Sequence, residues 1–427
     1  MINAITIFVI FIGLIILGAP IAMAIGLGTL AGTILGDFSI SSIPLLVSSG
    51  SSNASLIAIP YFILLGNIMN MGGIADRIYD FAEACIGHVK GGLAQVNVLG
   101  SVIFAGVSGT SSADAAGLGL VEIRSMEKKG YDLAFSASVT MVSSILGPLI
   151  PPSVSLLIYG SLTGTSVAEL FMGGLLPGIL AAIAMCITIY YLYVSGKVPM
   201  PAPTAFSWKR LWETTRDGIF ALLCPVVLFL TMTSGVVTTT EAGIVGAVYS
   251  IIVALIYKEL SWKKLLDACI ETVKSCTLIM FLIGMGSALG WVLTAMQIPQ
   301  AVADFLFALT DNKYILLLLI NIVLLILGMF MDSTVIQLLM VPILLPIMDA
   351  LLISRVHFGV MITVNILVGT MTPPFGLGLF IVTSITGLTI PQILKAAKPF
   401  FAPVIILLLL VTYVPAISTW IPSLLFG

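Results

Sequence analysis

The scarcity of charge over a long chain is the feature that most constrains this sequence. Its 427 residues are 59% hydrophobic and only 8% charged, and the mean hydropathy is +1.20. A soluble domain carries about 25% charged residues, so this chain cannot cover a large water-facing surface. A helix that spans a bilayer needs about 20 apolar residues, which leaves room for about ten spans. The sequence therefore predicts an all-α polytopic membrane protein with the lipid bilayer as its surroundings.

Composition also excludes several classes of function. The net charge of −2 gives no basic face for a nucleic acid. The five cysteines form no CxxC pair and only two histidines occur, so we expect neither a disulfide framework nor a transition-metal centre. No Lys or Arg precedes Arg77, and a signal peptide needs a positive first region, so residues 1–36 are expected to be mature membrane helices.

Two long apolar stretches, 91–126 and 313–349, have the wrong length for ordinary spans. Half of either stretch is about 15 residues, or about 22 Å of helix, which is shorter than the ~30 Å hydrocarbon core. We expect two re-entrant hairpins, because backbone that turns at membrane depth is tolerated only inside protein or beside a cavity. Ten ordinary spans are expected near 2–18, 20–37, 52–72, 133–162, 170–194, 218–235, 241–257, 275–297, 357–386 and 400–420.

Positive charge predicts how the chain crosses the membrane. With the N-terminus outside, only Lys313 and Arg355 of the 17 basic residues lie outside, which fits the positive-inside rule. Both termini are then periplasmic, the hairpin 91–126 opens to the cytoplasm and the hairpin 313–349 opens to the periplasm. The polar segment 196–217, with amphipathic Trp208 to Trp212, becomes a cytoplasmic linker.

The two sides of this linker resemble each other. Gly147-Pro148-Leu149-Ile150-Pro151-Pro152 recurs as Gly369-Thr370-Met371-Thr372-Pro373-Pro374, and Asp114 is paired with Asp332. We expect a first repeat over 1–195 with a broken span at 133–162, and a second over 218–427 with a broken span at 357–386. An odd number of spans per repeat inverts the second copy, and inverted repeats with paired discontinuous helices are typical of transporters. The loop 38–51 is placed outside and its counterpart 258–268 inside. The alternative is a structural bundle duplicated without a transport role.

The hairpin tips carry the groups suited to an ion. The first tip reads Gly106-Val107-Ser108-Gly109-Thr110-Ser111-Ser112-Ala113-Asp114 and the second Gly328-Met329-Phe330-Met331-Asp332-Ser333-Thr334. Hydroxyl, carbonyl and carboxylate oxygens are hard ligands that suit Na⁺. An acid at membrane depth is a functional candidate by default. Alternatively, each Asp caps the second half-helix of its hairpin. A capping role is also expected for Glu241, which lies in the turn after Thr238.

The paired prolines should form the other wall of the site. Proline removes a backbone donor, so the carbonyls of Gly147, Pro148, Gly369 and Thr370 are expected to be free for a cation. The half-helices that follow Pro151 and Pro373 should point their positive ends at a carboxylate. Adjacent cation and anion sites predict symport.

These motifs resemble the large membrane subunit of the tripartite ATP-independent periplasmic (TRAP) transporters over essentially the whole chain. The stretches that carry the resemblance are Ser108 to Gly117, Ile150-Pro151-Pro152-Ser153, Tyr159-Gly160, Pro177-Gly178, Met331-Asp332-Ser333-Thr334, Pro342 to Pro346 and Gly369 to Pro374.

The resemblance implies an elevator-type ion-transporter fold in a bacterial inner membrane. It implies a small membrane subunit of about four helices, a periplasmic substrate-binding protein, and sodium-driven uptake of an organic acid such as a C4-dicarboxylate or sialic acid. The implied sodium ligands are Ser108, Thr110, Ser111, Asp114 and Gly147 on one side and Gly328, Asp332, Ser333, Thr370 and Thr372 on the other. The substrate would lie between the tips, near Ser111, Pro151, Ser153, Thr372 and Pro373.

Three other functions stay open at this point. A self-sufficient sodium/carboxylate symporter would share the paired hairpins but need no binding protein. An intramembrane aspartyl protease would use Asp114 and Asp332 as a pair that shares one proton, but the Gly-x-Gly-Asp pattern is absent around both. A passive channel would conduct without ion coupling.

Overall fold

A computed structural model describes residues 2–233, 236–373 and 376–426, and within these ranges it is all-helical. The helices of the first half are α1 (Ile2–Ile16), α2 (Ile21–Leu35), α3 (Ser42–Ser51), α4 (Ala58–Met71), α5 (Ile74–Ile86), α6 (Leu93–Ser108), α7 (Ser111–Ala116), α8 (Leu118–Lys128), α9 (Leu133–Ser143), α10 (Val154–Thr163) and α11 (Val167–Val194), with 3₁₀ turns η1 (Ala54–Ile57) and η2 (Ser144–Leu146).

The second half repeats this succession of long and interrupted helices. Its members are α12 (Trp208–Thr233), α13 (Thr239–Ile256), α14 (Trp262–Ala295), α15 (Ile298–Leu309), α16 (Lys313–Gly328), α17 (Ser333–Ala350), α18 (Arg355–Thr370), α19 (Leu377–Thr386), α20 (Ile390–Tyr413) and α21 (Ala416–Phe426). The all-α polytopic fold expected from the sequence is confirmed.

Six described helices are long and apolar enough to cross a bilayer unaided: α11, α12, α13, α14, α17 and α20. The pair α4 and α5 passes the same test together, with a 70° bend between them. Other apolar helices are shorter, including α6, α9, α10, α16, α18 and α19 of the predicted hairpins and interrupted spans. A short helix that stops inside the protein must satisfy its terminal backbone groups there.

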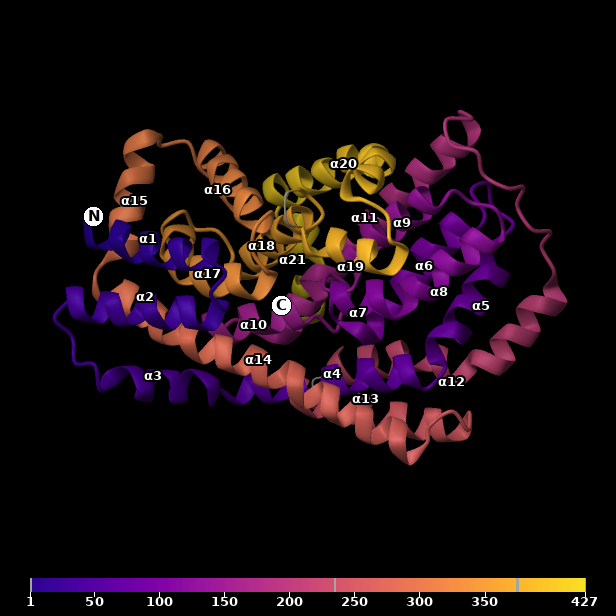
Figure 1. Cartoon of the computed structure of the whole chain (residues 1–427), viewed down its shortest axis with the longest axis horizontal. Coiled ribbons are helices and arrows are strands. Elements are labelled where there is room, and N and C mark those ends of the chain that lie inside the picture. Colours follow the sequence, from indigo (N-terminus) through magenta and orange to yellow (C-terminus); the bar gives the residue numbers. More distant parts are fainter. Residues whose placement is uncertain (1, 234–235, 374–375, 427) are drawn as a thin grey trace.

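The two halves interlock at these interior ends. The hairpin helix α7 of the first half packs on α19 of the second, and α10 of the first half packs on α17 and α18 of the second. The Tyr159 hydroxyl of α10 donates a hydrogen bond of 2.8 Å to the carbonyl of Arg355, where α18 begins. Figure 1 shows α7, α10, α18 and α19 gathered near the middle of the elongated molecule, with α14 running along one side beneath α2.

Three expected boundaries are wrong, each for an identifiable reason. The segment 38–51 is not a loop throughout, because its leucines and valine form α3, which packs along α14. The expected loop 258–268 and span 275–297 are also wrong, because α14 already begins at Trp262. Ser261 caps this helix by accepting a hydrogen bond of 3.3 Å from the backbone N–H of Lys264. The last apolar segment is not one span: α20 ends at Tyr413 and α21 begins at Ala416, because Pro415 between them lacks an N–H.

The predicted cap at Glu241 is confirmed. The backbone N–H of Thr238 donates to Glu241 Oε2 over 2.7 Å, and the N–H of Glu241 donates to Thr238 Oγ1 over 3.2 Å. This reciprocal capping box begins α13 and satisfies two of the donors that every helix start leaves open.

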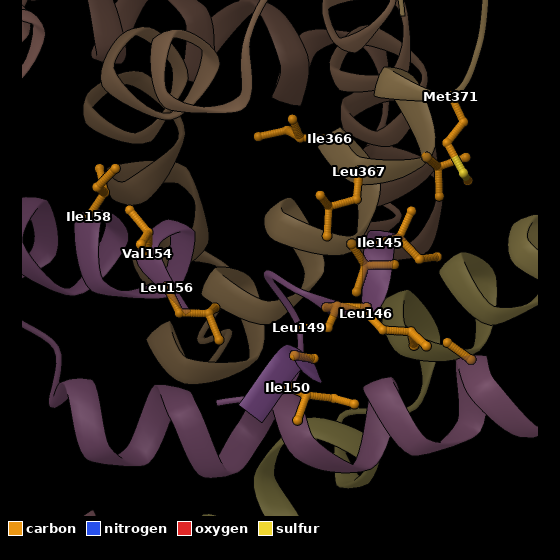
Figure 2. Packing of buried hydrophobic residues seen from close by; sticks show 14 of the residues in the cluster. Ile145, Leu146, Leu149, Ile150, Val154, Leu156, Ile158, Ile366, Leu367 and Met371 are labelled. Carbon is orange, nitrogen blue, oxygen red and sulfur yellow. The ribbon is translucent and has the colours of Figure 1, made fainter. Parts of the chain in front are cut away.

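The core joins both interrupted spans into one apolar cluster. Figure 2 shows Ile145, Leu146 and Leu149 of the first interrupted span in the same buried region as Ile366 and Leu367 of α18. Leu146 and Leu149 have no exposed surface, and Leu367 has 3%. The polar turns described below therefore rest on a tightly packed apolar base.

Glycine brings a hairpin and an interrupted span together in each half. A Cβ on Gly369 would lie 2.6 Å from Cα of Gly328, and a Cβ on Gly147 would lie 2.8 Å from the carbonyl oxygen of Thr110. Real Cβ atoms do not approach backbone atoms this closely. Only glycine at these positions allows the tip and the break to touch.

We expect Gly369→Ala to destabilise the protein, because its methyl group must push α16 away from α18. Overpacking of this kind costs about 1–3 kcal/mol, which thermal unfolding of the purified protein in detergent would show as a lower Tm. Gly13→Ala in α1 is the matched control, because nothing lies within 4 Å of its Cβ position. Equal Tm values for the two variants would contradict this account of the contact.

Candidate cation and substrate site

The first hairpin turns at Gly109, whose φ of +66° is a left-handed conformation that glycine adopts without strain. Thr110 then caps α7 by accepting a hydrogen bond of 3.2 Å from the N–H of Ala113. The turn is held against the first interrupted span, because the N–H of Val154 donates to the carbonyl of Gly109 over 3.1 Å.

Three oxygen atoms of this tip have no hydrogen-bond partner among the described residues: Ser108 Oγ, Ser111 Oγ and Asp114 Oδ1. Ser108 and Asp114 are 3% and 2% exposed. A buried polar atom without a partner costs free energy, and a buried carboxylate costs more. Hydroxyl and carboxylate oxygens are the ligands that a hard cation takes, so the first tip fits a cation such as Na⁺.

The second tip is built differently. Asp332 is the N-cap of α17, and its Oδ1 accepts a hydrogen bond of 2.8 Å from the N–H of Thr334. The sequence analysis offered helix capping as the alternative role of both aspartates. Asp332 does cap α17, whereas in the first tip Thr110, not Asp114, is the capping residue. Asp332 as a whole is only partly buried.

This difference corrects the pairing of the two acids. Thr110 and Asp332 both cap the helix that follows the turn, and their separation of 222 residues equals that between Gly147 and Gly369. At the same offset, Asp114 corresponds to Ile336, which is fully buried. Asp114 thus has no acidic counterpart in the second half.

The first interrupted span runs from α9 through η2 to α10. Ser153 caps α10 by accepting from the N–H of Leu156 (3.1 Å) and donates to the carbonyl of Pro148 (2.5 Å). The Ser153 side chain is fully buried and is not among the described residues of the cavity wall. The expectation of a free carbonyl at Pro148 is wrong because Ser153 occupies it.

Among the described residues, no backbone N–H donates to the carbonyl of Thr370 in the second interrupted span. The carbonyl of Gly369 accepts from the N–H of Thr372 (2.9 Å), so the expectation that it is free is wrong. Thr370 is followed at the third and fourth positions by Pro373 and Pro374, which have no N–H to donate to its carbonyl. Pro374, a residue of the predicted paired motif, lies outside the described residues.

Both tips and both breaks border one cavity of about 770 Å³. Among the expected site residues, those on its wall are Ser108, Thr110, Ser111, Asp332, Ser333 and Thr370. The first turns of α10 and α19 also line it, through Val154, Ser155, Leu377 and Gly378. Gly147 and Gly328 support the tips from behind by the close contacts described above. Pro151, Thr372 and Pro373 are not on the described wall.

Sequence reasoning missed the part of the wall that α4 and α14 form. Asn67 and Asn70 of α4 and Ser275 of α14 line the cavity, and Asn67 donates to Thr272 Oγ1 of α14 over 3.0 Å. The spacing of the two asparagines was a usable signal, because residues three apart share one face of a helix and α4 is otherwise apolar.

Buried polar networks fix the hairpins to the interrupted spans. In the first half, Asn97 of α6 donates to Thr140 Oγ1 (2.6 Å) and accepts from Ser143 (2.7 Å), both of α9. In the second, Asn365 of α18 donates to Asn321 Oδ1 of α16 over 2.7 Å. Hydrogen-bonded networks of this kind rigidify a core and hold each tip in place relative to its break. In the second network, Asn365 Oδ1 has no partner among the described residues.

We expect Ser153→Ala to lower stability while leaving ligand binding in the cavity unchanged. The substitution removes an N-cap, which costs about 0.5–2 kcal/mol. It also removes the hydrogen bond to the carbonyl of Pro148, a wall residue, but the Ser153 side chain itself is not on the described wall. A lower Tm in detergent together with an unchanged sodium dependence of unfolding is the predicted result. Loss of the sodium effect would instead place Ser153 in the site.

Comparisons with known proteins agree on one family. The family model of the DctM component of tripartite ATP-independent periplasmic transporters matches residues 8–417. The large permease SiaM of a sialic acid TRAP transporter of Vibrio cholerae is 35% identical over 98% of each chain. The C4-dicarboxylate large permease DctM of Pseudomonas aeruginosa is 37% identical over 93% of this chain and 92% of its own.

A further relative and a solved structure extend the comparison. The 2,3-diketo-L-gulonate large permease YiaN of Escherichia coli is 32% identical over 95% of each chain. The crystal structure of the YdaH transporter of Alcanivorax borkumensis, described as having an unusual topology, superposes with a TM-score of 0.62 at 13% identity and covers 88% of this chain and 87% of its own. At that identity the likeness shows the fold alone.

Proposed function

This chain belongs to the DctM-component family of tripartite ATP-independent periplasmic transporters and is a multi-pass transport protein rather than an enzyme, and on that premise we propose that it couples uptake of an organic acid to sodium. The observation that carries the proposal is the trio of unpartnered oxygens in the first tip, on Ser108 and Ser111, which line the shared cavity, and on Asp114, which is buried in the same tip. A bound Na⁺ would supply the partner that these oxygens lack.

The first cation site would be formed by Ser108, Thr110, Ser111, Asp114 and Gly147. No backbone hydrogen bond to the Gly147 carbonyl occurs within the described part of the chain, and the backbone of Gly147 abuts that of Thr110. A carbonyl, hydroxyls and one carboxylate together match the preference of a hard cation.

A second cation site would use Gly328, Asp332, Ser333, Thr370 and Thr372. Asp332 Oδ1 already accepts the capping bond from Thr334, so the other carboxylate oxygen would face the ion. The Thr372 hydroxyl donates to the carbonyl of Val368 over 2.8 Å and keeps its lone pairs for a cation. The two sites would thus bind sodium through different chemistry.

The substrate carboxylate would lie between the tips. The N-terminal turns of α10 and α19 line the cavity, and a helix start carries about half a positive charge. Ser111, Thr372 and the turns at Pro151 and Pro373 are the proposed contacts, although only Ser111 reaches the described wall. Sodium and carboxylate bound side by side would stabilise each other, which is the physical basis of the proposed symport.

The transport cycle would be of the elevator type in a bacterial inner membrane. The interlocked helices α7, α10, α17, α18 and α19 would move as one body past a layer that contains α4 with α13 and α14, both of which pack on α4. The proposed partners are a small membrane subunit of about four helices and a periplasmic substrate-binding protein. Both termini would be periplasmic.

Uptake of labelled organic acids into proteoliposomes that contain this chain and its small partner subunit tests the proposal. We expect accumulation only with both a sodium gradient and the substrate-binding protein. Sodium-driven uptake without the binding protein would identify a self-sufficient symporter. Uptake that is indifferent to sodium would contradict the proposed coupling.

Asp114→Asn should weaken the apparent sodium affinity at least about tenfold, which corresponds to about 1.4 kcal/mol, because it removes the buried negative charge of the first site. The measurement is half-maximal uptake as a function of sodium concentration. Glu127→Gln is the matched control, since Glu127 is an exposed acid on α8 of the same hairpin. Wild-type sodium dependence in both variants would remove Asp114 from the site.

Asp332→Asn separates capping from charge at the second tip. Asparagine is as good an N-cap as aspartate, so we expect the Tm without sodium to stay near the wild-type value. The stabilisation of the protein by sodium in a thermal unfolding titration should decrease. An unchanged response to sodium would reduce Asp332 to a capping residue.

A further inference from the structure

The described wall of the cavity holds one acid and no basic side chain. Asp332 is its only charged residue, and Asp114 is buried in the neighbouring tip. The undescribed residues are Met1, Ser234, Gly235, Pro374, Phe375 and Gly427, none of which is basic. Lys274 precedes the wall residue Ser275, but its Nζ pairs with Glu271 Oε1 over 2.7 Å. A bound anion therefore meets no Lys or Arg.

This charge distribution limits how much negative charge a ligand can bring. An anion taken from water into a cavity needs compensation by positive charge or hydrogen bonds. Two cations at the tips would neutralise Asp114 and Asp332, and the starts of α10 and α19 would supply partial positive charge to one carboxylate. The start of α17 also lines the cavity, but Asp332 caps it, so a second carboxylate on the same ligand would meet neither a basic side chain nor an uncapped helix start on the described wall.

The rest of the polar wall suits hydroxyl groups. Asn67 and Asn70 from α4, Ser155 from α10, Ser275 from α14 and Thr334 from α17 line the cavity. Amides and hydroxyls can both donate and accept hydrogen bonds, as the hydroxyls of a ligand do. The volume of about 770 Å³ lies within the roughly 300–1,000 Å³ of small-molecule sites, which admits an acid the size of a sugar.

We propose that the cavity selects hydroxylated organic acids with a single carboxylate and discriminates against dianions of the same size. This inference rests on the proposed function, because the cations that offset the aspartates are the proposed sodium ions. It adds a rule of selection by charge that the purified membrane protein should obey without its binding protein.

Direct binding to the full-length chain in lipid nanodiscs, measured by calorimetry with saturating sodium, tests this proposal. Five probes separate charge from hydroxylation: gluconate and N-acetylneuraminate are hydroxylated monoanions, glucarate and succinate are dianions, and hexanoate has one carboxylate and no hydroxyl. The tightest binder should be a hydroxylated monoanion, and gluconate should bind at least about tenfold more tightly than glucarate, a difference of about 1.4 kcal/mol.

The outcomes distinguish this inference from the proposed function. A dianion as the tightest binder would overturn selection by charge, and hexanoate binding as tightly as gluconate would overturn the role of the hydroxyls. Either result leaves sodium-coupled transport standing. No binding of any of the five acids in sodium, with uptake also insensitive to sodium, would overturn the proposed function itself.

A variant can test the physical cause of the selection. Ser275 is exposed on the wall and belongs to neither proposed sodium site. Ser275→Lys adds the missing positive charge and should reduce or reverse the preference for gluconate over glucarate. Ser275→Gln, the neutral control of similar reach, should keep the wild-type ratio. An unchanged ratio in Ser275→Lys would show that charge is not the basis of selection.

Discussion

The helices stop inside the protein at four places, the two hairpin tips and the breaks of the two interrupted spans. At each place the polar backbone groups at the helix ends need hydrogen-bond partners. Water cannot supply them in an apolar surround. The structure uses N-caps at Thr110, Ser153 and Asp332, and close backbone contacts at Gly147 and Gly369. Each tip therefore touches a break, and the contacts that complete the backbone also bring both halves to one cavity.

The two halves are more alike in the positions of their caps, glycines and prolines than in the side chains of their tips. The offset of 222 residues relates the capping residues, the break glycines and the prolines. Within this common frame, Asp114 stands where the second half has Ile336. The first tip has three oxygens without partners among the described residues, whereas in the second tip Asp332 uses one carboxylate oxygen to cap α17. The two halves thus share a backbone frame, and the two proposed cation sites differ in the side chains that this frame carries.

Much of this arrangement could be predicted from the sequence, because apolar length and paired Gly and Pro residues act locally. The all-α polytopic fold, the family and the role of Glu241 are confirmed. The expected free carbonyls at Pro148 and Gly369 are wrong, because local hydrogen bonds from Ser153 and Thr372 depend on turn geometry that composition does not specify. The spacing of Asn67 and Asn70 marks one polar face of α4, but the cavity that this face and Ser275 line forms only through tertiary packing, so all three residues were missed. The inverted orientation and the ligand roles stay predictions.

The central claim is that the oxygens of the first tip hold a cation. A structure determined by cryo-electron microscopy in sodium, and again with choline in place of sodium, tests it most directly. The account predicts ion density bounded by Ser108, Ser111 and Asp114 in sodium that is absent in choline. The same empty tip in both conditions, or sodium-dependent density only at places remote from both tips, would contradict it.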